Sequence, residues 1–141
     1  PKYRASIAAC IAYLGDIKRK QGEPAAALLR YREAAAIGAV SGETNGMAQI
    51  YSGIGQLLYL LGRYEESGKY LERASAVLSA NGYRWGLERS EAYLALLSVK
   101  QGKKEEARQH LERARYIASR IQNPETELLI HGAEEAVAEA E

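Results

Sequence analysis

The sequence lacks the cysteine content that a disulfide scaffold or a cysteine-rich metal site requires. Cys10 is its single cysteine, which excludes an intramolecular disulfide and a cysteine-based metal site. The neighbours Ala9 and Ile11 are apolar, so we expect Cys10 to be a small buried hydrophobe. A reducing, cytoplasmic setting fits such a chain best.

Charge of one sign and long hydrophobic runs are also lacking. Nineteen basic and eighteen acidic residues leave a net charge of +1, which provides no overall attraction to nucleic acid or to an anionic membrane. The apolar run Ile7–Ala12 is far too short to cross a bilayer, and no signal-peptide pattern opens the chain. We therefore expect a soluble protein with no nucleic-acid partner and no membrane partner.

Motifs that carry chemistry are missing as well. His110 and His131 lie far apart, and neither belongs to a His-Glu-x-x-His pattern that would place metal ligands and a base on one helix face. Gly53-x-Gly55 falls inside a predicted helix, whereas a phosphate-binding loop would follow a strand. The sequence predicts no catalytic residue, no metal and no cofactor, and we expect that the chain is not an enzyme.

What the sequence does contain is an internal repeat with a period of 40 residues. Gly22, Gly62 and Gly102 recur at that interval, each where a left-handed helix cap is wanted. Apolar and small positions recur at the same interval on both sides of the glycine. Upstream of the glycine there are three aligned sets: Leu14, Ile54 and Leu94; Gly15, Gly55 and Ala95; and Ile17, Leu57 and Leu97. Downstream of it there are four: Ala27, Ser67 and Ala107; Tyr31, Leu71 and Leu111; Ala34, Ala74 and Ala114; and Ile37, Val77 and Ile117.

The spacing of these positions is helical. Downstream of each glycine they are separated by four, three and three residues, which places them on one face of an α-helix. Pro24 suits a first helical turn, and Asn123 followed by Pro124 suits a cap and a helix start. We expect turns between units at Asn45-Gly46 and Asn81-Gly82. The predicted helices span about 4–21, 24–40, 46–61, 64–80, 86–101, 104–121 and 124–139.

Large apolar residues beside small ones predict that each unit is an antiparallel helical hairpin. The chain is thus expected to be all-α, with three hairpins and a C-terminal capping helix. We assign 1–141 to one repeat domain, with repeats at about 4–42, 43–82 and 83–122 and a closing helix at 124–139. The chain begins at Pro1 without an initiating Met, so we expect it to be a piece of a larger protein.

The recurring residues resemble the tetratricopeptide repeat (TPR) family. The resemblance rests on Leu14-Gly15, Ile54-Gly55 and Leu94-Ala95, on the turn glycine, and on the paired small residues of the second helices. It implies a right-handed superhelical solenoid. The unit of 40 residues is longer than the usual ~34 and is similar to the repeats of MalT-like bacterial regulators and LGN-type scaffolds. HEAT repeats are the alternative structural interpretation.

By this resemblance, the first helix of each unit lines a concave groove that holds a protein or peptide. The implied partner-binding residues are Tyr13, Asp16, Arg19, Lys20, Gln49, Ser52, Gln56, Tyr59, Arg89, Tyr93, Leu96 and Lys100. Their mixture of basic, polar and aromatic side chains suits a segment that carries acidic and apolar residues.

The leading hypothesis for function is therefore a protein-protein interaction module of a cytoplasmic signalling or transcription-regulatory protein. One alternative is a structural element that self-associates, as a homo-oligomer, through exposed solenoid ends. A small-ligand sensor with a pocket between the helices is the least favoured alternative.

Overall fold

The computed structural model describes residues 3–39 and 44–140, and these fold into helices without any strand. The predicted all-α class is confirmed. In chain order the helices are α1 (Arg4–Lys20), α2 (Pro24–Gly38), α3 (Asn45–Leu60), α4 (Tyr64–Ala80), α5 (Leu87–Lys100), α6 (Lys104–Ala118) and α7 (Pro124–Ala140).

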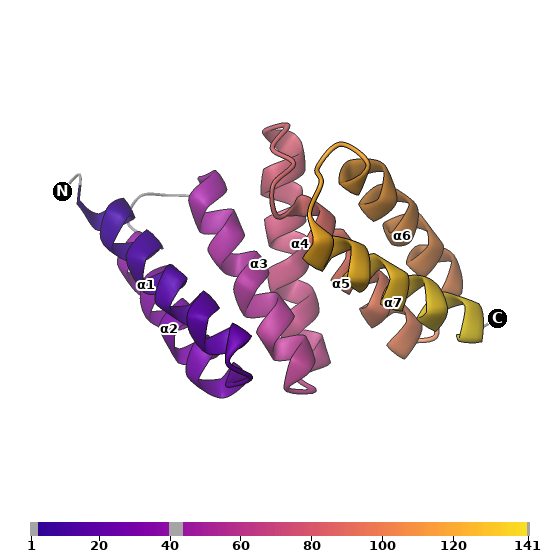
Figure 1. Cartoon of the computed structure of the whole chain (residues 1–141), viewed down its shortest axis with the longest axis horizontal. Helices are drawn as coiled ribbons and strands as arrows, with labels where there is room; N and C mark the ends of the chain where they lie inside the picture. The colour runs from indigo at the N-terminus through magenta and orange to yellow at the C-terminus, as the bar shows by residue number, and fades with distance from the viewer. Residues whose placement is uncertain (1–2, 40–43, 141) are drawn as a thin grey trace.

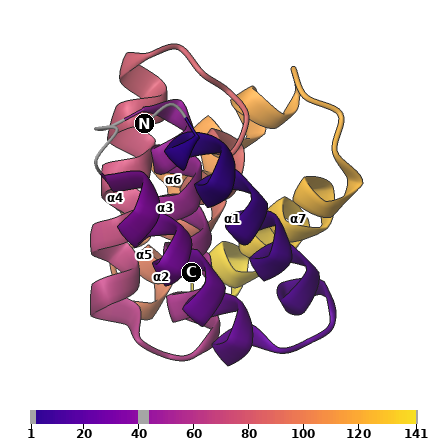
Figure 2. The ribbon, with the colours of Figure 1, turned by 90° about the vertical axis from the view of Figure 1, so that its left-hand side faces the viewer.

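The helices form a solenoid of three antiparallel hairpins, α1–α2, α3–α4 and α5–α6, which stand side by side (Figure 1). The closing helix α7 packs on α5 and α6. Seen from the N-terminal end, α1 and α7 lie on one side of the array and α4 lies on the other (Figure 2). The first helices and α7 therefore surround a common face.

The glycines of the repeat end the first helix of each unit as predicted. Gly22, Gly62 and Gly102 have φ of 77°, 79° and 75°, a conformation that costs other residues free energy. In each turn the next residue donates its amide to a carbonyl five positions back, as Arg63 does to Leu58 at 2.9 Å. This is the Schellman arrangement, and it satisfies carbonyls that the helix end leaves open.

Within the hairpins, the small residues mark the places where two helices approach closely. Ala27, Ala34, Ala74, Ala107 and Ala114 have no exposed surface. Ser67, the one polar member of its aligned set, donates its hydroxyl to the carbonyl of Gly55 at 2.6 Å. The hydroxyl therefore has a partner in a buried position, where an unpaired one would be costly.

Two predicted boundaries need correction. Asn45-Gly46 is the start of α3 rather than a turn, because Thr44 caps this helix and accepts a hydrogen bond from the Met47 amide at 3.2 Å. The helix predicted to reach 121 ends at Ala118, where the chain continues in tight turns. Residue 40, the predicted end of the second helix, lies outside the described residues. Asn81-Gly82 is a turn, as predicted.

The expectation that Cys10 is buried is wrong, because its side chain is exposed. Leu14 and Ile17, on the same face of α1, are exposed too. Their counterparts one repeat later, Ile54 and Leu57, are fully buried where α3 packs beside the first hairpin. The pattern of the sequence is the same in both helices, but in the described structure no hairpin covers this face of α1.

The closing helix packs through one side of its surface. Ile130, Ala133 and Val137 are buried, and Ile130 contacts a cluster formed by Ala92, Ala114 and Ala118. Asn123 caps the helix, since its side-chain oxygen accepts from the Glu125 amide at 3.1 Å. No helix among the described residues is long and apolar enough to cross a membrane.

Candidate functional site

A cavity of about 510 Å³ lies between the first helices α1, α3 and α5. Its apolar wall consists of small side chains of α1 and of two larger side chains of α3: Ala5, Ala8, Ala9, Ala12, Met47 and Ile50. Alanine side chains leave space that longer side chains would fill, so the alanines of α1 keep this part of the cavity open.

Tyr31 forms part of the cavity floor. Its ring lies between two glycines, so that a Cβ added to Gly53 would come within 2.7 Å of the ring and one added to Gly15 within 3.0 Å. The Tyr31 hydroxyl donates a hydrogen bond to the Asp16 carboxylate. Burial, and then this hydrogen bond, raise the pKa of Tyr31, so the phenol stays protonated and fixes Asp16 on the cavity wall.

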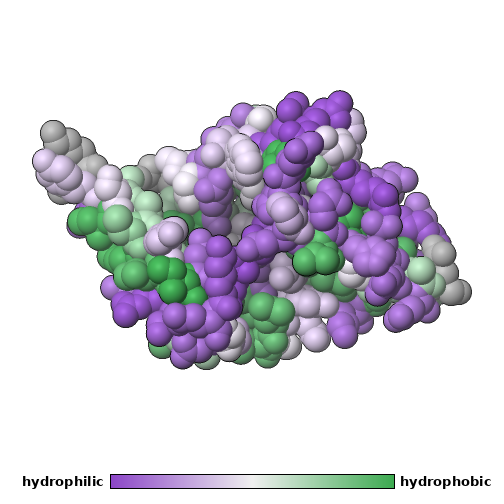
Figure 3. Space-filling model, in the orientation of Figure 1, coloured by the Kyte–Doolittle hydropathy of each residue, from purple (hydrophilic) through white to green (hydrophobic). Residues whose placement is uncertain are grey.

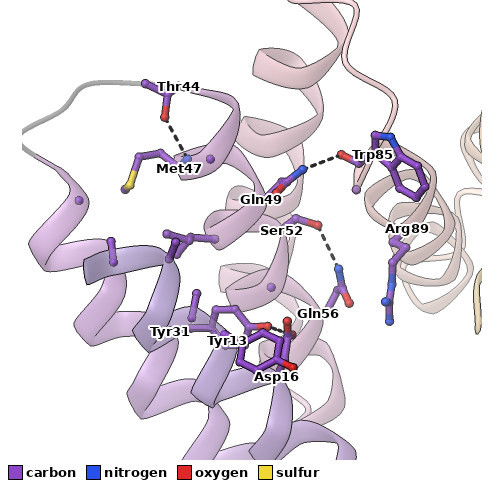
Figure 4. Close-up of a pocket in the computed structure, with 18 of the residues that line it drawn as sticks. Tyr13, Asp16, Tyr31, Thr44, Met47, Gln49, Ser52, Gln56, Trp85 and Arg89 are labelled. Atoms are coloured by element: carbon purple, nitrogen blue, oxygen red, sulfur yellow. Dashed lines mark hydrogen bonds between the residues drawn. The ribbon is translucent and has the colours of Figure 1, made fainter. Parts of the chain in front are cut away.

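A row of polar side chains on α3 crosses the cavity. Gln49, Ser52 and Gln56 stand between the side chains of α1 and Arg89 of α5 (Figure 4). Gln49 donates to the Trp85 carbonyl at 3.3 Å, and Gln56 donates to the Ser52 hydroxyl at 3.0 Å. These side chains have defined positions, because they hydrogen-bond to one another and to the turn before α5.

Basic side chains gather at one end of the cavity. Arg19 of α1 and Arg89 of α5 both pair with Glu125 of α7, at 3.8 Å and 3.3 Å. Lys20 is 3.9 Å from the same carboxylate. The Arg89 Nε is buried and has no hydrogen-bond partner. Glu125 therefore links the first and last helices across the open side of the array.

Glu88 adds a buried carboxyl group to the wall of the cavity. Its side chain lies at the start of α5, and burial raises its pKa. One of its carboxyl oxygens, Oε2, has no hydrogen-bond partner, as is uncommon for a buried polar atom. Across the described ranges, no three His, Cys, Asp or Glu side chains are grouped so that they could hold a metal ion.

The structure divides the predicted groove residues into two sets. Those that line the cavity are Tyr13, Asp16, Arg19, Gln49, Ser52, Gln56 and Arg89. Those that do not are Lys20, Tyr59, Tyr93, Leu96 and Lys100. Lys20 lies near Glu125, at the basic end. The other four belong to the second and third units.

The second set centres on an aromatic cluster between α3 and α5. The Tyr59 ring lies 5.4 Å from that of Tyr93 and 5.3 Å from that of Tyr64, and Lys100 lies over Tyr64 at 5.8 Å. Leu96 and Leu129 of α7 pack against the same cluster. Tyr93 is buried here, so its side chain contributes to packing in this structure.

Sequence reasoning missed several cavity residues. Trp85 is exposed in the turn before α5 and lines the cavity; the one tryptophan of the chain, in a turn between repeats, is a signal that could have identified it. Tyr31, one of the aligned repeat positions, is buried in the core, and its hydroxyl bonds to Asp16 at the cavity. The role of Glu125 depends on where α7 packs, which the repeat pattern does not specify.

Comparison with known proteins agrees with this architecture. Crystal structures of the nearly identical TPR-like repeats of a kinesin light chain from Podosopora anserina superpose on the chain. One, a single-substitution variant, has a TM-score of 0.71 at 16% identity and covers 98% of this chain and 71% of that one. The other has 0.70 at 17% identity and covers 96% and 71%. At these identities the likeness concerns the fold.

Among curated proteins, no relative matches the sequence. The family model described as tetratricopeptide repeat matches residues 46–120, which is more than half of the chain. The match begins in α3 and ends just beyond α6, so that it covers the second and third hairpins. The chain therefore belongs to the tetratricopeptide repeat family.

Proposed function

We propose that the cavity between α1, α3 and α5 binds a segment of another protein. The segment would place an apolar side chain against the alanines of α1 and an acidic group at Arg19 and Arg89. The observation that supports this most is the combination, in one cavity, of an apolar wall with two guanidinium groups at one end. TPR repeats generally mediate protein-protein interaction, which agrees with this proposal.

The contacts of Glu125 support an acidic group in the partner. This carboxylate lies between Arg19 and Arg89, where it holds the place that we assign to the acidic group. Glu125 is half exposed, and exposed ion pairs contribute little to stability. An incoming carboxylate can therefore replace it at small cost and pair with the same two guanidinium groups.

The open edge of the cavity favours a protein segment over an enclosed small molecule. Tyr13 lies at this edge and is 67% exposed, so that its ring is available to a ligand that continues along the surface. Tyrosines in such positions contribute large contacts with a polar tip. We also propose a cytoplasmic signalling or regulatory context, in keeping with the single cysteine and the repeat architecture.

Selection of a ligand followed by titration tests this proposal. A displayed library of short random peptides, selected against the folded chain, is expected to yield sequences with an acidic residue near a large apolar one. Tyr13→Ala should weaken binding of the selected peptide at least about fivefold, because truncation of an aromatic anchor typically costs more than about 1 kcal/mol.

Tyr116→Ala is the matched control for Tyr13→Ala. Tyr116 is 62% exposed and lies on α6, whose residues do not line the cavity. Its removal should leave affinity unchanged, and circular dichroism should show equal helicity in both variants. Equal losses from the two changes would argue against the cavity as the binding site, as would a selected peptide that binds only through Tyr116.

The basic end of the cavity provides a separate prediction. Glu125→Gln should strengthen binding of the acidic peptide about twofold to fivefold, because the arginines no longer share an internal carboxylate. Glu127→Gln removes an equally negative, exposed side chain of the same helix and should have no such effect. Isothermal titration of both variants measures the difference. Weaker binding in Glu125→Gln would mean that Glu125 supports the site rather than competes for it.

A further inference from the structure

The basic end of the cavity holds more positive charge than its carboxylates neutralise. Arg19, Lys20 and Arg89 all lie within 4 Å of Glu125. Asp16 is the second acidic group here, 3.8 Å from Arg19. Within the described part of the chain, three cations thus face two carboxylates. In the space-filling view, hydrophilic residues cover most of the surface between α1, at the left, and the start of α7, near the centre (Figure 3).

The geometry around Glu125 shows that one carboxylate is too small for this set of cations. The Arg89 guanidinium donates a hydrogen bond to Oε2 at 3.3 Å. Arg19 shares the same oxygen but stays 3.8 Å away, and Lys20 is 3.9 Å from Oε1, beyond the length of a hydrogen bond. A phosphoryl group presents three acceptor oxygens, one for each cation, and arginine commonly pairs with such oxygens in bidentate fashion.

The charge of the ligand that best fits this end follows from the same residues. When an incoming group displaces Glu125, the three cations face Asp16 alone, which leaves an excess of two positive charges. Burial raises the pKa of Glu88, the neighbour of Arg89 in the chain, and so favours the neutral form of that carboxyl. A carboxylate returns one negative charge, whereas a phosphoryl group carries about −1.5 to −2 at pH 7.

The two arginines are held in place before any ligand arrives. Their side chains are only 21% and 20% exposed. Arg19 pairs with Asp16, which in turn accepts the hydrogen bond of the Tyr31 hydroxyl. Arg19 also lies in the last turn of α1, where the helix dipole favours a cation. Binding of an anion therefore requires little rearrangement of these two groups, which favours affinity.

We propose that the acidic group bound at the basic end is a phosphoserine or phosphothreonine of the partner segment. This rests on the proposed function, because it requires that a protein segment occupies the cavity. The phosphoryl group lies among Arg19, Lys20 and Arg89, and an apolar side chain of the same segment lies against the alanines of α1. An unphosphorylated serine brings no charge to this end, so phosphorylation of the partner switches binding on.

A peptide array in three versions tests the proposal. Each short random peptide carries phosphoserine, glutamate or serine at its central position, and fluorescence anisotropy measures the affinity of the tightest binders. The phosphoserine versions should bind at least about fivefold more tightly than the glutamate versions, because the added negative charge acts on three cations. The serine versions should bind most weakly. Equal affinities of the phosphoserine and glutamate versions would overturn this inference and leave the proposed function standing, whereas no binding in any version would overturn both.

A lysine variant tests the position of the phosphoryl group. Lys20→Gln should lower the ratio of phosphoserine to glutamate affinity about twofold to fivefold, because a lost cation costs a dianion more than a monoanion. Lys104→Gln makes the same change at an exposed lysine of α6 that does not line the cavity, and it should leave the ratio unchanged. Circular dichroism should show equal helicity in both variants. An unchanged ratio in Lys20→Gln would overturn the assignment.

Inorganic phosphate provides the last comparison. It should compete with the phosphoserine peptide far more weakly than the unlabelled peptide does, because it makes no contact with the apolar wall of the cavity. Competition by inorganic phosphate as strong as that by the unlabelled peptide would overturn the proposal, since the protein segment would then contribute nothing to recognition.

Discussion

Gly55→Leu is expected to lower the free energy of unfolding by about 1 to 3 kcal/mol or more, because the site has no room for a side chain. A Cβ at this position would lie 2.6 Å from Leu71 Cγ and 3.2 Å from the Leu71 backbone nitrogen. Leu71 is fully buried, so it cannot move into solvent. The two helices of the middle hairpin would have to separate. Urea denaturation followed by circular dichroism measures the change.

Two further variants show whether the effect comes from this contact. Adding Leu71→Ala to Gly55→Leu should recover part of the loss, since the two side chains would compete for one space. Gly132 is a helical glycine with nothing within 4 Å of an added Cβ, and Gly132→Ala should raise stability by about 0.5 to 1 kcal/mol. An unchanged midpoint for Gly55→Leu would contradict the packing of α3 on α4.

Removal of α7, by ending the chain after Ile121, is expected to lower the unfolding temperature and to promote aggregation. The closing helix buries Ile130, Ala133 and Val137 against α5 and α6, and its loss would expose the apolar surfaces that these side chains cover. A shortened chain that stays monomeric and melts at the wild-type temperature would mean that α7 does not stabilise the array.

A single substitution measures the same contribution in the full-length chain. Ile130→Ala should cost about 2 to 5 kcal/mol, because Ile130 is buried in a cluster with Ala92, Ala114 and Ala118. Leu128→Ala removes an exposed side chain of the same helix and should change stability by less than about 0.5 kcal/mol. Comparable effects of the two changes in urea denaturation would contradict the observed orientation of α7.

The helices and their pairing were predictable because every hairpin repeats the same local rules. The turn glycine ends a helix, the small residues permit a close crossing, and the apolar residues fill the space beside it. Gly62 and its neighbours illustrate this, since the turn geometry follows from one residue that tolerates a positive φ. These features depend on residues close together in the sequence, and the same features recur in each of the three units.

Features that depend on the ends of the array were not predictable in this way. Cys10 and Leu14 have the residue types of a buried position, but burial also needs a neighbouring helix, and the pattern does not specify one. The cap at Thr44 was missed because Asn45-Gly46 is a strong turn signal that the helix start overrides. The groove residues were chosen by face alone, which could not separate the buried Tyr93 from the exposed Tyr13.

Site-specific photo-cross-linking of the selected peptide tests the assignment of the cavity most directly. A benzophenone amino acid is placed at position 13, beside the cavity, or at position 116, on α6, and the labelled peptide is identified by mass spectrometry. The proposed function predicts that the peptide cross-links to the chain from position 13 and that excess unlabelled peptide abolishes the product. Cross-linking from position 116 without any from position 13 would contradict it.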